Sequence, residues 1–77
     1  MAERRVVDIK GMQCPQPLSI VSSELSKMPM GAELEVLTDD FICYMMVQRL
    51  LKMLGEEILE ATQLEDGTYK IVCIRKA

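Results

Sequence analysis

Hydrophobic and polar positions repeat with short, regular periods along most of the chain, and the first half predicts two strands. In residues 4–10, Val7 and Ile9 fall on the same side of an extended segment. Residues 33–38, Glu-Leu-Glu-Val-Leu-Thr, alternate between polar and apolar side chains. A period of two is typical of a strand that buries one face. We therefore predict strands over both segments.

A helix is predicted between these two strands. Its apolar positions recur at three- and four-residue steps, the period of a helix with one buried face. These positions are Leu18, Val21, Leu25 and Met28. Pro29 and Gly31 follow and stop the periodic pattern, as residues that break helices do. The prediction is a helix over residues 17–28.

A second helix is predicted over residues 41–54, the longest periodic stretch of the chain. We expect its core-facing positions to be Ile42, Met46, Leu50 and Met53. Asp39 and Asp40 precede it and are good N-cap residues, because a short acidic side chain can accept hydrogen bonds from free backbone N–H groups. Gly55 follows as a suitable C-cap.

The last part of the chain predicts a hairpin. Two strands, over residues 57–63 and 68–75, are separated by Asp66-Gly67, a dipeptide typical of tight turns. The resulting order βαβαββ predicts an α/β two-layer sandwich, with two helices packed on one face of a four-stranded mixed sheet. Because strand–helix–strand crossovers are right-handed, the first two strands should be parallel and both helices should begin at the same sheet edge.

Composition narrows the functional classes. With 77 residues the chain is expected to form a single domain over residues 1–77. No apolar run approaches the roughly 18 residues of a membrane span, and the N-terminus lacks a secretory h-region. We therefore expect a cytoplasmic protein with no membrane partner. The net charge of −3 and the absence of a Lys/Arg cluster argue against direct nucleic-acid binding.

The chain contains three cysteines and no histidine. An odd number of widely spaced cysteines without an export signal is not expected to form a disulfide framework. A zinc site is not expected either, because such sites use about four ligands, usually in close pairs or with histidines. We expect no metal and no cofactor. Any chemistry must then use sulfur, carboxylates, amines or the backbone.

Cys14 is the candidate nucleophile. It stands between the first predicted strand and the first predicted helix, in the run Gly11-Met12-Gln13-Cys14-Pro15-Gln16-Pro17. A helix start offers partial positive charge and free N–H groups, and both favour a thiolate. The two prolines suit the first turn of a helix, where no intrahelical N–H bond is lost. We predict that Cys14 is accessible to solvent and reactive.

The ten residues from Asp8 to Pro17 resemble a known signature. Asp8-Ile9-Lys10-Gly11-Met12-Gln13-Cys14-Pro15-Gln16-Pro17 is similar to the D-x-x-G-x-x-C-P-x-P motif of the TusA/SirA/YedF family of small sulfur-carrier proteins. The chain length and the βαβαββ order are similar as well. The resemblance implies that Cys14 carries a persulfide, and that Asp8 and Gly11 shape the approach to it. It also implies that Pro15 and Pro17, on either side of Gln16, start the helix.

The same resemblance implies protein partners. The donor would be a cysteine desulfurase or a rhodanese-like protein, and the acceptor would be a thiol-bearing protein in tRNA thiolation or sulfur metabolism. The protein would be a sulfurtransferase-type carrier without turnover of its own.

Two interpretations stay open for Cys43, which falls in the first turn of the second predicted helix at the same sheet edge as Cys14. It is either a small apolar core residue or a second thiol that resolves or accepts sulfur. The alternative function is a thiol redox or regulatory binding module that uses Cys14 with Cys43, for which the Cα–Cα distance should be about 4.4–6.8 Å. A third is a partner-binding domain with an idle thiol. Cys73, in the last strand, is expected to be structural.

The residues around the second helix start have further candidate roles. Asp39 and Asp40 either cap the helix or, if they lie close to the reactive cysteine, disfavour its thiolate. Phe41, Tyr44 and Met45 are expected to form an exposed apolar rim, which is where a partner protein would dock.

Overall fold

The computed structural model describes residues 3–77. The elements follow in the predicted order, which confirms the fold class. They are β1 (Arg4–Asp8), α1 (Leu18–Ser26), β2 (Glu33–Thr38), α2 (Phe41–Met53), β3 (Glu57–Gln63) and β4 (Tyr69–Ile74). Most bounds agree with the predicted ranges to within one or two residues, the usual scatter at element ends.

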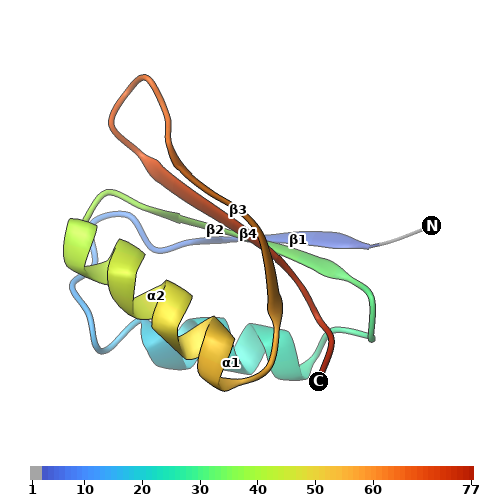
Figure 1. The fold of residues 1–77 in the computed structure, drawn as a ribbon. Helices are drawn as coiled ribbons and strands as arrows, with labels where there is room; N and C mark the ends of the chain where they lie inside the picture. Colours follow the sequence, from blue (N-terminus) through green and yellow to red (C-terminus); the bar gives the residue numbers. More distant parts are fainter. Residues whose placement is uncertain (1–2) are drawn as a thin grey trace.

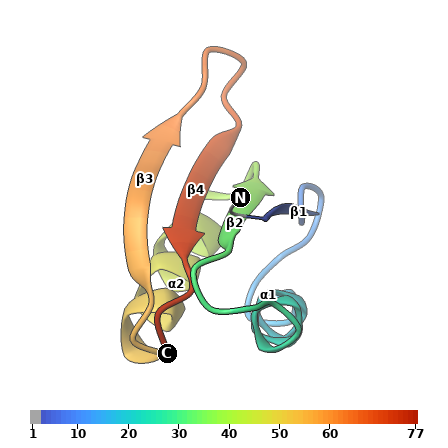
Figure 2. The ribbon, with the colours of Figure 1, turned by 90° about the vertical axis from the view of Figure 1, so that its right-hand side faces the viewer.

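The four strands form one mixed sheet in the order β1-β2-β4-β3. The predicted parallel pairing of β1 with β2 is confirmed, and β4 runs antiparallel to both β2 and β3. The second crossover therefore skips a position, which the last strand fills. Both helices pack on the same face of the sheet, as expected for two right-handed crossovers (Figures 1 and 2).

The core lies between this face and the two helices. The predicted inner face of α1 is confirmed, since Val21, Leu25 and Met28 are buried and Leu18 packs against them. The sheet contributes alternate residues of its two central strands, which are Leu34, Val36, Thr38, Ile71 and Cys73.

The predicted inner face of α2 is wrong at Ile42 and Met53, although Leu50 does pack against the core. The buried residues of this helix are Cys43, Val47 and Leu51, whereas Ile42 and Met53 are 57% and 78% exposed. The reason lies in the sequence itself, because residues 41–47 are all hydrophobic and several helical faces fit such a run equally well. The phase of the helix is set instead by the short connection from β2, which fixes where the first turn begins.

Within residues 3–77, no helix combines the length and the apolar character needed to cross a bilayer.

Candidate functional site

Two loops meet at one edge of the sheet. Because β1 and β2 are parallel, their carboxyl ends lie side by side, and the loop after β1 runs next to the short connection that leads into α2 (Figure 1). The Ile9 N–H extends the strand pairing by one bond, donating to the Leu37 carbonyl at 2.9 Å. The topology thus brings the segment around Cys14 to the start of α2.

Asp8, Gly11 and Asp39 shape this junction. The Asp8 carboxylate accepts a hydrogen bond from the Lys10 N–H at 2.9 Å, which closes a turn directly after β1. Gly11 has a φ of +83°, a conformation that glycine adopts without steric cost. Its N–H donates to the Asp39 carboxylate at 3.0 Å and so ties the cysteine loop to the β2–α2 connection.

Asp40 is the N-cap of α2. Its carboxylate accepts a hydrogen bond from the Cys43 N–H at 3.0 Å, and its own N–H donates to the hydroxyl of buried Thr38 at 3.1 Å. Asp39 and Asp40 therefore divide the work at this edge, one holding the loop and the other capping the helix. Cys43 is the third residue of α2, where the partial positive charge of a helix N-terminus is greatest.

Cys14 and Cys43 are joined by a disulfide bond, with their Cα atoms 5.3 Å apart. The expectation that the cysteines form no disulfide framework is therefore wrong for this pair. Composition alone could not reveal it, because the two residues are 29 positions apart and meet only through the parallel pairing of β1 and β2. The sequence left two alternatives for Cys43, a core residue or a second thiol beside Cys14. The structure shows both, because Cys43 is fully buried and bonded to Cys14. Cys14 is partly exposed.

Cys14 lies outside the first turn of α1. Helix α1 begins at Leu18 with Pro17 as its N-cap, so Cys14 and Pro15 lie in the preceding turn. The Cys14–Pro15 peptide bond is cis. The first N–H groups of α1 already donate to the carbonyls of Pro15, Gln16 and Pro17. The helix start next to the cysteine sulfur is instead that of α2, reached through Cys43.

An open hollow of about 550 Å³ adjoins the cysteine loop. Its lining comes from both sides of Cys14 in the sequence and includes no charged side chain. The lining residues are Gly11, Met12, Gln13, Gln16, Pro17, Ser19 and Ile20. A small molecule can therefore approach this side of the loop without meeting a carboxylate.

The predicted apolar rim lies beside the disulfide. Phe41 and Met45 are 55% and 51% exposed, while Tyr44 is half-buried and stacks on Tyr69, with ring centroids 4.5 Å apart. Phe41 packs against both tyrosine rings. Sequence reasoning missed Tyr69, because its place beside α2 depends on the pairing of β4 with β2, where it stands opposite Thr38.

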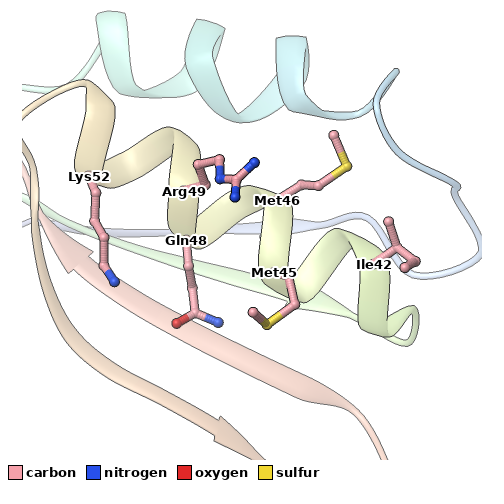
Figure 3. A pocket seen from close by; sticks show the side chains of 6 residues that line it. All are labelled: Ile42, Met45, Met46, Gln48, Arg49 and Lys52. Carbon is pink, nitrogen blue, oxygen red and sulfur yellow. The ribbon is translucent and has the colours of Figure 1, made fainter.

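The rim continues along the exposed side of α2. Figure 3 shows a shallow hollow there, apolar near the helix start and basic further along. Its volume is about 420 Å³. The lining residues are Ile42, Met45, Met46, Gln48, Arg49 and Lys52.

Cys73 lies apart from this site, in the interior of β4 opposite Leu34. Burial raises the pKa of its thiol to about 11, with a smaller contribution from the negative charge of Glu56. At neutral pH this thiol is protonated and shielded from solvent. Among residues 3–77, no group of three or more His, Cys, Asp or Glu side chains is arranged to hold a metal ion.

The structure is that of a small α/β protein with a disulfide-linked cysteine pair at one sheet edge. Residues 5–76 match the model of the family described as "Sulfurtransferase TusA". This chain belongs to the TusA sulfurtransferase family.

Individual relatives agree with this assignment. A protein of Archaeoglobus fulgidus named "Putative sulfur carrier protein" is 33% identical over 66 residues, which cover 86% of each chain. An uncharacterized protein of Methanocaldococcus jannaschii is 34% identical over 68 residues, but these make up only 24% of that longer protein. The crystal structure of a SirA-like protein from Desulfitobacterium hafniense has a TM-score of 0.84 and 20% identity, covering 95% of this chain and 99% of that one. The last comparison shows the shared fold.

Proposed function

We propose that this protein is a sulfur carrier that holds a persulfide on Cys14 and passes its terminal sulfur to another protein. The observation that carries the proposal is the exposure of Cys14. Of the three cysteines it alone keeps part of its surface in solvent, whereas Cys43 and Cys73 are fully buried. Membership of the TusA sulfurtransferase family and similarity to a relative named as a sulfur carrier support the proposal.

The chemistry needs only sulfur. In the reduced protein, the Cys14 thiolate attacks the terminal sulfur of a persulfide on the donor, and the donor cysteine leaves as a thiolate. An acceptor thiolate then attacks the terminal sulfur on Cys14, and Cys14 leaves in turn. Each step exchanges one sulfur–sulfur bond for another, so no external oxidant is consumed. The protein is thus a carrier without turnover of its own.

The partners are proteins. The donor is a cysteine desulfurase or a rhodanese-like protein, and the acceptor is a cytoplasmic thiol-bearing protein that delivers sulfur to tRNA or to sulfur metabolism. The docking surface is the rim of Phe41, Tyr44 and Met45, because exposed aromatic and methionine side chains are enriched at protein interfaces.

A charge placed in the rim tests the docking surface. Met45→Glu should slow sulfur loading from the donor at least tenfold. Met53→Glu, at the far exposed end of the same helix, should leave loading unchanged. Equal effects of the two variants would remove the rim as the docking surface.

Mass spectrometry tests the carrier function directly. Reduced protein incubated with a cysteine desulfurase and cysteine should gain the mass of one sulfur atom. Cys14→Ser should lose this gain, and Cys73→Ala, which removes a buried cysteine remote from the site, should keep it. If Cys14→Ser loads as well as the wild type, Cys14 is not the carrier.

A second candidate function is a thiol redox or regulatory module that uses Cys14 with Cys43. Their Cα–Cα distance of 5.3 Å favours it, since it lies inside the range of about 4.4–6.8 Å that a disulfide requires. Cys43→Ala distinguishes the two functions. A pure carrier transfers sulfur from donor to acceptor at the wild-type rate without Cys43, whereas a redox module loses its response to oxidants.

A further inference from the structure

The two cysteines of the disulfide are unequally exposed. Cys14 lies in a surface loop and is partly exposed, whereas Cys43 has no exposed surface and belongs to the core cluster. A nucleophile from solvent can therefore reach the bond only from the Cys14 side. Attack at Cys14 makes Cys43 the leaving group.

Cys43 is the leaving group. It occupies the first turn of α2, where the partial positive charge of the helix start stabilises the negative charge that develops on its sulfur, whereas burial and the Asp40 carboxylate at the cap oppose that charge. Protonation on release removes the opposed charge. Once it takes up a proton, the Cys43 thiol can donate to the Met12 carbonyl, which lies 3.9 Å from its sulfur. The open state thus has a partner ready for the released group.

The nucleophile that suits this site is small. The hollow formed by residues on both sides of Cys14 is lined by uncharged side chains, so its lining presents no carboxylate to an anion. A thiol that attacked Cys14 would leave a mixed disulfide. Hydrosulfide, by contrast, would leave a persulfide, the state that the carrier function requires.

We propose that the Cys14–Cys43 disulfide is a loading site for inorganic sulfide, which opens it to give a persulfide on Cys14 and a thiol on Cys43. Hydrosulfide attacks the sulfur of Cys14, the bond to Cys43 breaks, and its electron pair goes to Cys43, which takes a proton from solvent. The sulfide is oxidised to sulfane sulfur and the disulfide is reduced, so no other redox partner takes part. The inference rests on the proposed role of Cys14 as the carrier.

One molar equivalent of sodium sulfide, added to the oxidised protein without oxygen, tests the proposal. The intact mass should rise by that of one hydrogen sulfide molecule. After alkylation, trypsin separates the three cysteines, because cleavage follows Lys10, Lys27, Arg49 and Lys70. The added sulfur should lie on peptide 11–27, which holds Cys14. Sulfur on peptide 28–49, or reduction of the disulfide without retained sulfur, would overturn the proposal.

Two controls complete the experiment. Reduced wild-type protein has the same sequence without the disulfide and should not load from sulfide. Cys43→Ala, which cannot form the bond, should also stay unloaded by sulfide but should still load from a cysteine desulfurase. If oxidised wild type ignores sulfide while the desulfurase loads Cys14, the inference fails and the carrier function stands. If neither route loads Cys14, the carrier function itself fails.

Discussion

Cys73 is a thiol whose ionisation is opposed by its surroundings. Burial in β4 raises its pKa to about 11 from an ordinary 9.0. The neutral thiol is favoured in the folded protein. The contribution of Cys73 to the free energy of unfolding is therefore fully present below about pH 9 and is lost as the pH rises from about 9 to about 11. The pKa difference corresponds to a loss of about 3 kcal/mol in the free energy of unfolding.

Urea unfolding across this pH range measures the loss. The comparison uses a Cys14→Ser/Cys43→Ala background, in which no disulfide can exchange, with and without Cys73→Ala. All other ionisable groups are common to the two proteins, so only the Cys73 contribution differs. Identical pH dependence of the two proteins would show that Cys73 ionises as easily in the fold as in the unfolded chain.

Gly11 and Gly31 have similar φ angles and allow a controlled comparison of two substitutions. Both have positive φ and space for a Cβ atom, so an alanine at either should lower the free energy of unfolding by about 1–2 kcal/mol through backbone strain alone. Gly11 alone bonds to Asp39 in the cysteine loop. Gly11→Ala should therefore also slow re-formation of the disulfide from reduced protein, while Gly31→Ala should not. Equal oxidation rates of the two variants would show that the turn at Gly11 does not help to bring the two cysteines together.

At the scale of the element, the orientation of α2 has a direct energetic test. Leu51 is fully buried, whereas Met53 on the same helix is 78% exposed. Leucine and methionine have similar helix propensities, so truncation of either to alanine differs mainly in the cavity it leaves. Leu51→Ala should cost about 2–5 kcal/mol of stability, and Met53→Ala should change it by less than about 0.5 kcal/mol. Denaturant midpoints would show the reverse order if the helix packed through the face predicted from periodicity.

The same helix explains why one sequence pattern was informative and another was not. In α1, most residues between Leu18, Val21 and Leu25 are polar, so the pattern identifies one buried face, with Ile20 outside it. In α2, the first seven residues are all hydrophobic, and the period alone cannot choose among them. The cap at Asp40 and the length of the connection after Thr38 make that choice in the folded protein.

For the whole molecule, the disulfide is the covalent link between the two crossover units. It closes a segment of 29 residues, and a loop of this size should stabilise the fold by about 3–4 kcal/mol, mainly by restricting the unfolded chain. Urea titration of oxidised and reduced protein should show this difference. In Cys14→Ser/Cys43→Ala, reductant should have no effect; an equal shift in that variant would trace the change to Cys73 or to the reductant itself.

Some contacts that complete the fold join residues far apart in sequence and cannot be predicted from local sequence patterns. Helix α1 has no basic residue in its last turn. Arg75, which directly follows β4, donates to the Leu25 and Met28 carbonyls at 2.7 Å and adds a second positive charge beside the C-cap residue Lys27. The placement of β4 between β2 and β3 is of the same kind, and it brings Tyr69 to the rim.

Interactions between residues close in sequence were sufficient to predict most of the secondary structure of this protein. Alternation along the strands, the period of α1, the hairpin at Asp66-Gly67 and the cap at Asp40 depend on neighbouring residues, so the six elements and their order follow from the chain as read. The motif around Cys14 likewise indicates the family, and the match to the TusA family model confirms it. The Cys14–Cys43 bond, the inner face of α2 and the stacking of Tyr44 on Tyr69 join residues remote in sequence. They depend on strand order and register, because only the packing of the helices against the sheet determines which distant side chains meet.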